Sequence, residues 1–251
     1  MDKSIPIFEH PELDGKSLYF KGNQIGILLI HGFTATTVEV RWLADYLHNK
    51  GLTICAPLLP GHGTTPHDLN KKKYTDWLDC VEEAYFSLRK SCNTIIVGGE
   101  SMGAVLSLYL AEKFSEIKAL LLYSPAIKVS SLKYAKFLRF YKPIIQKSNY
   151  DDILPWQGYT VYPLFAANEF LLLQKLVIQK LSQVKQPILI FHGAYDRTID
   201  LDNRDVIYSS VNSSIKVKQI MSDSGHVMLL DKEFNLIAEQ TLDFIIYLKI
   251  L

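Results

Sequence analysis

Short aliphatic runs alternate along the chain with longer segments whose apolar residues recur every three or four positions. An uninterrupted aliphatic run is typical of a strand buried on both faces of a parallel sheet, and the longer spacing predicts helices that cover such a sheet. The expected strands lie at residues 25–32, 52–57, 94–99, 117–125, 187–193 and 215–222, and the expected helices at 36–50, 75–90, 102–114, 202–210 and 234–248. This alternation predicts one α/β domain with a mostly parallel, doubly wound sheet.

The first expected helix carries its own start and stop signals. Thr36 is a candidate N-cap, and Glu39 follows it three residues later, which is the spacing of a capping box. Gly51 comes after the last apolar position and can close the helix as a C-cap residue. We therefore expect the Glu39 side chain to bond to the backbone where this helix begins.

The alternation stops between Ala126 and Val184, where no aliphatic run typical of a strand occurs. Aromatic and basic residues dominate this stretch. We interpret residues 127–182 as an insertion over the sheet, and residues 1–126 and 183–251 as the core. Five apolar side chains in the insertion could wall a pocket for an acyl or aryl group, or could form the insertion's own core. They are Trp156, Tyr159, Tyr162, Phe165 and Leu172.

The first half of the insertion is basic. Residues 127–152 contain six lysines and arginines and two aspartates, so the local excess is six minus two, or +4. A solvated helix face is the expected explanation, and an anion site or a membrane-surface site is the alternative. The charged side chains are Lys128, Lys133, Lys136, Arg139, Lys142, Lys147, Asp151 and Asp152.

The overall composition excludes several classes of protein. Of 251 residues, 48% are hydrophobic and 21% are charged, which is typical of a globular domain rather than a disordered or fibrous chain. The net charge of +1 provides no field that would gather nucleic acid. No window approaches the ~18 apolar residues of a membrane span. The N-terminal segment MDKSIPIFEHPELDG lacks the apolar core of a signal peptide, so we expect a cytoplasmic protein.

The cysteines also agree with a cytoplasmic protein. Cys55, Cys80 and Cys92 are widely spaced and form no C-x-x-C pair, so we expect buried thiols rather than a disulfide framework or a zinc site. The sequence calls for no metal and no organic cofactor. The oligomeric state, monomer or homodimer, is left open.

One short segment carries the clearest chemical signal. Gly99-Glu100-Ser101-Met102-Gly103 fits the pattern G-x-S-x-G and lies between an expected strand and an expected helix, which is the context that gives this motif its meaning. A serine on so tight a turn takes a strained backbone conformation, and the flanking glycines prevent collisions. The Ser101 hydroxyl is therefore a candidate nucleophile beside the positive end of a helix dipole.

A serine nucleophile needs a base, and the base needs a carboxylate that orients it. Asp196 follows the strand at 187–193, with Asp200 as the less favoured alternative, and His226 follows the next strand. The order Ser, Asp, His is that of the α/β-hydrolases. The other histidines are not expected to transfer protons. A solvated surface position is expected for His10, His48 and His67, and a structural role for His31, His62 and His192, which lie in glycine-flanked turns or at a strand end.

Acyl transfer also requires an oxyanion hole. Two backbone N–H groups are needed where the carbonyl oxygen gains charge. Met102, directly after the proposed nucleophile, supplies one, and Phe33 in the segment HGFTATT is the candidate for the other.

With these segments identified, the chain resembles an α/β-hydrolase of the bacterial carboxylesterase and monoacylglycerol lipase family. The resemblance runs through most of the chain and rests on GILLIHGFTATT, PLLPGHGTTPHDL, YTDWLDCVEEAY, GGESMGAVLSLYLAE, HGAYDRTID and SGHVMLLDKE, in that order. It implies Ser101 as nucleophile, His226 as base and Asp196 as orienting acid, with Phe33 and Met102 amides around the oxyanion. It also implies that the insertion is a lid. Glu100 departs from the family pattern, and we expect it to perturb nearby titration or to pair with a surface base.

These features predict a serine esterase that cleaves short- to medium-chain acyl or aryl esters through an acyl-enzyme, with a small-molecule ester as its partner. Transfer of the acyl group to another alcohol, or to peroxide, would use the same intermediate and remains an alternative. A binding protein or receptor with a vestigial hydrolase site is the alternative from another class.

Overall fold

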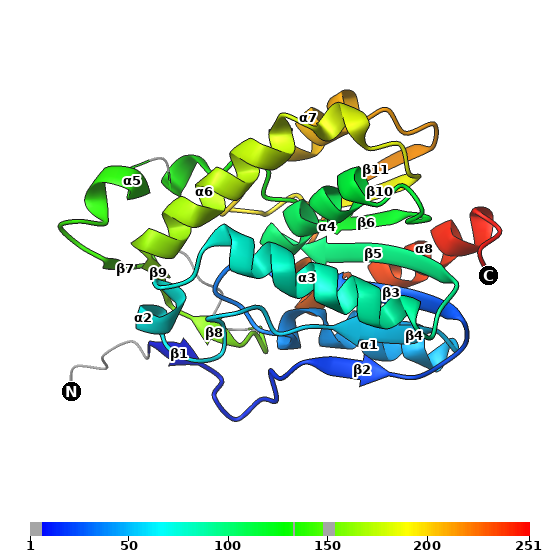
Figure 1. Ribbon diagram of the computed structural model, residues 1–251, viewed down its shortest axis with the longest axis horizontal. Helices are drawn as coiled ribbons and strands as arrows, with labels where there is room; N and C mark the ends of the chain where they lie inside the picture. The colour runs from blue at the N-terminus through cyan, green and yellow to red at the C-terminus, as the bar shows by residue number, and fades with distance from the viewer. Residues whose placement is uncertain (1–6, 133, 148–153) are drawn as a thin grey trace.

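A central seven-stranded sheet organises the protein (Figure 1). The structure is a computed structural model that describes residues 7–132, 134–147 and 154–251. The strand order is β11-β10-β6-β5-β3-β4-β2, and only β2 is antiparallel to its neighbour. The strands are β2 (Leu18–Phe20), β3 (Ile25–Ile30), β4 (Thr53–Ala56), β5 (Thr94–Glu100), β6 (Leu120–Tyr123), β10 (Ile188–Gly193) and β11 (Lys216–Met221). The predicted mostly parallel α/β sheet is thus confirmed.

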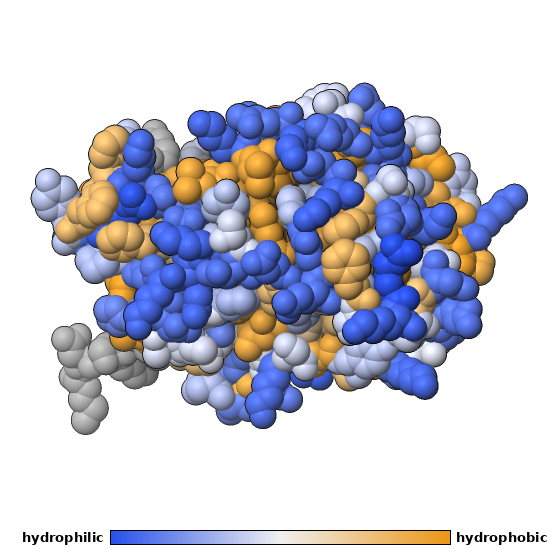
Figure 2. Space-filling model, in the orientation of Figure 1, coloured by the Kyte–Doolittle hydropathy of each residue, from blue (hydrophilic) through white to orange (hydrophobic). Residues whose placement is uncertain are grey.

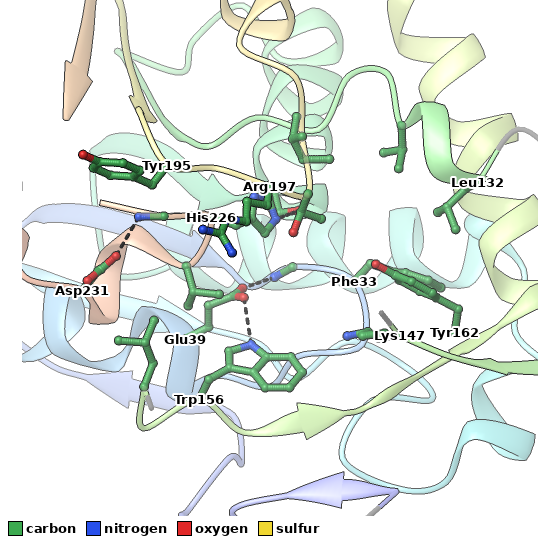
Figure 3. A pocket seen from close by; sticks show the side chains of 18 of the residues that line it. Phe33, Glu39, Leu132, Lys147, Trp156, Tyr162, Tyr195, Arg197, His226 and Asp231 are labelled. Atoms are coloured by element: carbon green, nitrogen blue, oxygen red, sulfur yellow. Dashed lines mark hydrogen bonds between the residues drawn. The ribbon is translucent and has the colours of Figure 1, made fainter. Parts of the chain in front are cut away.

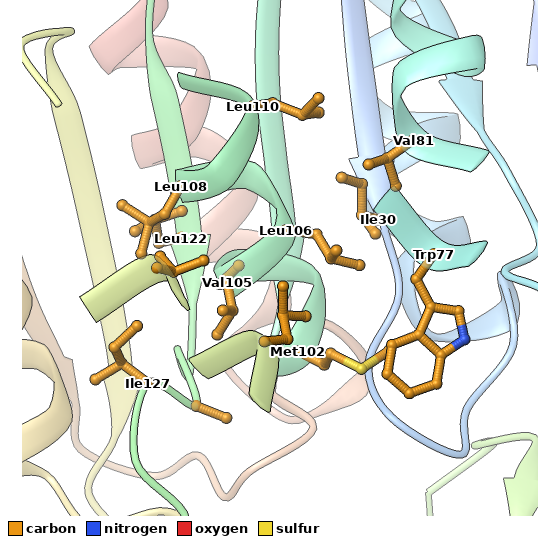
Figure 4. Packing of buried hydrophobic residues seen from close by; sticks show 14 of the residues in the cluster. Ile30, Trp77, Val81, Met102, Val105, Leu106, Leu108, Leu110, Leu122 and Ile127 are labelled. Atoms are coloured by element: carbon orange, nitrogen blue, oxygen red, sulfur yellow. The ribbon is translucent and has the colours of Figure 1, made fainter. Parts of the chain in front are cut away.

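Helices cover both faces of this sheet. The residues of β3 alternate between the two layers: Leu28 and Ile30 pack into one hydrophobic cluster, and Ile27 and Leu29 into the other. The first cluster, part of which Figure 4 shows, lies under α3, α4 and α6, and the second lies under α1 and α8. The helices are α1 (Val38–Asn49), α2 (Pro66–Leu69), α3 (Tyr74–Arg89), α4 (Met102–Lys113), α5 (Ala135–Leu138), α6 (Leu164–Ile178), α7 (Asp202–Ser210) and α8 (Phe234–Tyr247).

The N-terminus of α1 differs from its prediction. The N-cap is Thr37, not Thr36, and its side chain makes no capping bond to the helix. The hydroxyl of Thr36 instead donates to Gln157 Oε1 at 2.8 Å, and Glu39 bonds to a loop outside the helix. The predicted capping box is therefore wrong: the Glu39 carboxylate bonds to Gly32 outside the helix, and Thr36 Oγ1 accepts the Val38 N–H at 3.4 Å rather than that of Glu39. Gly51 has φ of +89° and donates to His48 O, as expected for a residue that closes a helix.

The segment between β6 and β10 contains short strands, contrary to the expectation of none. β7 (Ile144–Gln146) pairs with β9 (Val161–Pro163), and β8 (Gly158–Tyr159) pairs with β1 (Phe8–Glu9) from the N-terminal region. Strands of two or three residues are too short to appear as an aliphatic run. The single-turn helices η1 (Ser130–Leu132) and η2 (Leu181–Gln183) begin and end this insertion. Figure 1 shows it at the end of the molecule toward which β5 points.

The basic side chains of the insertion separate into two groups. Lys128, Lys136 and Lys142 are exposed, in agreement with a solvated surface, whereas Lys147 is half-buried. Apolar side chains are also exposed around α5 (Figure 2), where Phe137 and Phe140 are 66% and 69% accessible. The predictions for the N-terminal residues 1–6, for Lys133 and for Asp151 and Asp152 fall outside the described residues.

No helix in the described part of the chain combines the length and apolarity needed to cross a membrane.

Candidate active site

Ser101 lies at a strained corner between β5 and α4. Its φ of 57° and ψ of −113° are unfavourable for a residue with a side chain. The corner is possible only because its neighbours are glycines: a Cβ on Gly103 would lie 1.9 Å from Ile30 O, and one on Gly99 would lie 2.5 Å from the same oxygen. The close approach of the β3 backbone therefore explains why both flanking positions are glycine.

The structure brings Ser101, His226 and Asp196 together from three distant segments. His226 Nε2 lies 3.0 Å from Ser101 Oγ, and His226 Nδ1 lies 2.7 Å from Asp196 Oδ2. The two segments that follow β10 and β11 meet here because those strands are adjacent and parallel. Asp200, the alternative acid, is exposed and accepts a hydrogen bond from Ser130 instead.

Asp196 is held ionised by its surroundings. Its side chain is completely buried, and its Oδ1 accepts the backbone N–H groups of Thr198 and Ile199, each at 2.8 Å. Burial alone would raise the pKa of Asp196, but the charge of His226 and hydrogen bonds from both histidines and Ile199 hold that pKa well below its usual value. His192 Nε2 lies 3.1 Å from Asp196 Oδ2, so this histidine, expected to be structural, supports the carboxylate.

The pKa of His226 is shifted upward, opposite to that of Asp196. Burial by itself lowers the pKa of His226, but the charge of Asp196 and its hydrogen bond outweigh burial, and the pKa of His226 lies above its ordinary value of 6.5. The carboxylate of Glu39 adds to this effect, whereas Lys147 opposes it. The pair can therefore take up a proton and stabilise the imidazolium that results.

This pKa predicts the pH dependence of activity. Only neutral His226 can accept the Ser101 proton, so kcat/KM should rise with pH along a limb whose midpoint lies above pH 6.5. The measurement is kcat/KM for a neutral 4-nitrophenyl ester from pH 5 to pH 9, with the liberated phenol quantified at constant ionic strength. A midpoint below pH 6.5, or a profile without this limb, would contradict the assignment.

The segment Gly32–Phe33–Thr34 faces the corner at Ser101. Within residues 7–132, 134–147 and 154–251, no protein acceptor is bonded to the backbone N–H of Phe33 or of Met102. A Cβ on Gly32, the residue before Phe33, would lie 3.1 Å from Ser101 Cβ, and Phe33 lines the same cavity as Ser101. That these two N–H groups form an oxyanion hole stays a prediction.

A buried carboxylate that sequence reasoning assigned elsewhere supports this loop. Glu39 Oε2 accepts the Gly32 N–H at 2.5 Å, and Glu39 Oε1 accepts Trp156 Nε1–H from the insertion at 3.2 Å (Figure 3). Burial raises the pKa of Glu39, and these hydrogen bonds together with the charges of His226 and Lys147 oppose that rise. The motif spacing suggested a helix cap, and nothing in the local sequence could have indicated Gly32 as the partner.

The insertion is bonded directly to the same loop. Thr34 O accepts the Tyr159 N–H at 2.9 Å, and Lys147 Nζ donates to Thr34 Oγ1 at 2.6 Å. Thr34 itself has φ of +68°, a conformation that is unfavourable for a β-branched residue and needs such external support. The insertion thus helps to fix the backbone on which Phe33 lies.

A cavity of about 610 Å³ opens onto Ser101 and His226. Of the five apolar residues suggested for the pocket, Trp156 and Tyr162 line it, together with Phe33 and Phe170. The other three do not line this cavity. Tyr159 is buried with its hydroxyl donating to Gly61 O, Phe165 packs edge-on against Phe140, and Leu172 is 44% exposed on α6. They belong to the insertion's own packing or surface.

Glu100 pairs with no surface base among the described residues, contrary to one of the two expectations for it. It is completely buried, its Oε1 accepts the Leu229 N–H at 3.3 Å, and burial next to Glu39 raises its pKa well above the ordinary value. In the part of the chain that the structure describes, no cluster of three or more His, Cys, Asp or Glu side chains could hold a metal ion.

The site and the fold define the class of α/β-hydrolases. In this class a serine, a histidine and an aspartate are joined by hydrogen bonds at the carboxyl edge of a sheet with this strand order. Residues 23–158 match the family described as "Serine aminopeptidase, S33". The chain is 32% identical over 241 residues to the thermostable monoacylglycerol lipase of Bacillus sp. (strain H-257), covering 94% of this chain and 96% of that protein. It is 29% identical over 238 residues to the carboxylesterase of Bacillus subtilis (strain 168), covering 92% and 96%.

The solved structures agree. One from a study of two metagenome-derived lipolytic enzymes, LipS and LipT, has a TM-score of 0.88 and 27% identity, covering 92% of this chain and 97% of that one. The chain belongs to the α/β-hydrolase family that includes these bacterial carboxylesterases and monoacylglycerol lipases. It is an ester hydrolase.

Proposed function

We propose that the protein is a serine carboxylic-ester hydrolase that cleaves short- to medium-chain acyl or aryl esters through an acyl-enzyme on Ser101. The single observation that carries this proposal is the position of His226. Its Nε2 lies 3.0 Å from Ser101 Oγ, and its Nδ1 lies 2.7 Å from Asp196 Oδ2. The kinship to a carboxylesterase and a monoacylglycerol lipase supports an ester as the substrate.

The proposed reaction proceeds in two halves. His226 accepts the Ser101 proton while Ser101 Oγ attacks the acyl carbon, and the N–H groups of Phe33 and Met102 hold the oxyanion. His226 then donates that proton to the departing alcohol, which leaves an acyl group on Ser101. Water, deprotonated by His226, attacks the acyl carbon in the second half and releases the acid. The ionised Asp196 stabilises the imidazolium in both halves.

Residues 127–182 are proposed to act as the lid over this site, and residues 1–126 and 183–251 as its core. Trp156 and Tyr162 from the proposed lid line the same cavity as Ser101, which supports a role in enclosing the acyl or aryl group. The cavity volume, about 610 Å³, suits a ligand of modest size.

Trapping the intermediate tests the proposal. Mixing the protein with 4-nitrophenyl butyrate in a rapid-quench instrument should give a burst of 4-nitrophenol and a protein mass increased by one butanoyl group. Proteolysis and fragmentation should locate that group on Ser101. Product analysis with added methanol measures how much of the acyl group passes to an acceptor other than water. Hydrolysis without a covalent intermediate on Ser101, or with the acyl group on another residue, would refute the mechanism.

A further inference from the structure

Three basic residues line the catalytic cavity. Lys232 is exposed, and its backbone N–H donates to Asp231; the other two are Lys147 and Arg197. Lys147 follows β7 in the insertion, and Arg197 directly follows Asp196 after β10; both line the cavity that contains Ser101 (Figure 3). The mechanism proposed above uses neither charge.

Lys147 is held in position, and no carboxylate in the described part of the chain forms an ion pair with it. Its ammonium donates to Thr34 Oγ1 and lies over the rings of Trp156 and Tyr162, at 4.7 Å and 5.2 Å from their centroids. An ammonium has three donors, and one of them is bonded here. No carboxylate of the described residues lies within 4.0 Å of Lys147 Nζ. Loss of water by burial lowers the pKa of Lys147 to about 7, and the charge of Glu39 offsets only part of this.

Arg197 is even less engaged. Within residues 7–132, 134–147 and 154–251, its guanidinium makes no hydrogen bond, ion pair or ring contact, although it presents five donors. Its neighbour in sequence, Asp196, is occupied by His226, His192 and backbone N–H groups. Figure 3 shows Arg197 beside His226.

The acidic groups of the cavity do not satisfy these cations. Glu39 is bonded to the Gly32 N–H and to Trp156, and Asp231 accepts the backbone N–H groups of Gly225 and Lys232. Asp223 is exposed at the rim. Among the described residues, these carboxylates therefore serve the protein's own donors, and the remaining donors of Lys147 and those of Arg197 face the cavity without a protein acceptor. Lys147 is a partly buried charge without an ion pair among the described residues, which is uncommon in proteins except at functional sites, whereas Arg197 is exposed at the cavity.

We propose that Lys147 and Arg197 form a subsite for a carboxylate carried by the substrate, so that the preferred substrates are esters with a second, ionised carboxyl group. The inference rests on the proposed ester hydrolysis and narrows its substrate class. Charge-assisted hydrogen bonds from an ammonium and a guanidinium to a carboxylate are strong and directional. A bound carboxylate would also stabilise the ammonium form of Lys147, which burial disfavours in the free protein.

Two pairs of esters test the subsite on either side of the scissile bond. Mono-4-nitrophenyl glutarate and 4-nitrophenyl pentanoate differ by a carboxylate on the acyl group, and 3-acetoxybenzoate and phenyl acetate differ by one on the leaving group. For at least one pair, Lys147→Met should lower the ratio of kcat/KM for the acidic ester to that for the neutral ester by about tenfold. Arg197→Met should lower the same ratio at least about threefold. The matched control, Lys136→Met, removes an exposed lysine outside the cavity and should leave both ratios unchanged.

A second measurement uses only the unmodified protein, in case Lys147→Met does not fold. Free glutarate should inhibit hydrolysis of 4-nitrophenyl pentanoate competitively, and uncharged 1,5-pentanediol should inhibit it at least tenfold more weakly. Equal inhibition by the two compounds, or ratios that neither variant changes, would overturn the subsite while leaving the hydrolase intact. Failure of the unmodified protein to cleave any of the four esters would instead overturn the proposed function and the subsite with it.

Discussion

Replacing Ser101 by alanine should reduce kcat for 4-nitrophenyl butyrate by about 10⁴-fold or more. The change removes the only atom that can form the proposed acyl-enzyme, whereas the oxyanion donors and the pocket remain. Residual turnover should therefore exceed the uncatalysed rate only modestly, show no burst and leave no acyl group on the protein. Alanine also carries a Cβ, so the strained backbone at this corner gains no relief. Initial rates and the burst amplitude measure the effect.

The control for this variant is Ser115→Ala, which removes an exposed hydroxyl just after the same helix. It should retain the activity of the unmodified protein. Circular dichroism and the unfolding midpoint should show that Ser101→Ala is folded, because His226 is the only hydrogen-bond partner of the lost hydroxyl among the described residues. A folded Ser101→Ala protein that kept more than about a tenth of the activity would exclude Ser101 as the nucleophile.

Replacing Asp196 by asparagine should reduce kcat by about 10⁴-fold while leaving KM nearly unchanged. An amide in this position can present its NH₂ group to His226 Nδ1 and favour the wrong tautomer, and it cannot stabilise the imidazolium. The effect should be large because the Asp196 side chain is fully buried, so no water can replace its charge. The apparent pKa of His226 should also fall, since the charge of Asp196 raises it in the unmodified protein. A pH–rate profile of the residual activity measures that shift.

Asp200→Asn is the matched control, because Asp200 is the other carboxylate in the same segment and bonds to Ser130 rather than to His226. It should behave like the unmodified protein. If Asp200→Asn caused the large loss and Asp196→Asn did not, the assignment of the acid would be wrong.

The proposed carboxylate subsite predicts a substrate preference of its own for this protein. Between Asp152 and Glu169 the insertion has no acidic side chain that could bind the hydroxyls of a monoglyceride. Its charged group at the cavity is Lys147, which suits an anionic substituent better than a neutral polyol. Charge in the pocket, rather than acyl length alone, is therefore expected to govern substrate choice.

Local pattern was sufficient for much of the architecture. The aliphatic run before Ser101 and the apolar spacing after it identified β5 and α4 because neighbours along the chain decide both signals. The short strands of the insertion were missed, since two or three residues pair through backbone atoms and leave no side-chain pattern. The capping role of Glu39 failed for a related reason: its carboxylate bonds to Gly32 and Trp156, and the second of these lies 117 residues away.

The sequence by itself determined the βα order, the glycine-flanked corner at Ser101 and the chain order of serine, aspartate and histidine. Each of these depends on residue types at short spacing, or on succession along the chain. Only the tertiary structure decided that Asp196 rather than Asp200 contacts His226, that Glu39 and the insertion bond to the loop that carries Phe33, and that Lys147 and Arg197 share a cavity. The physical reason is that hydrogen bonds and charges act through distance in space, and parallel strands bring together residues that are far apart in sequence.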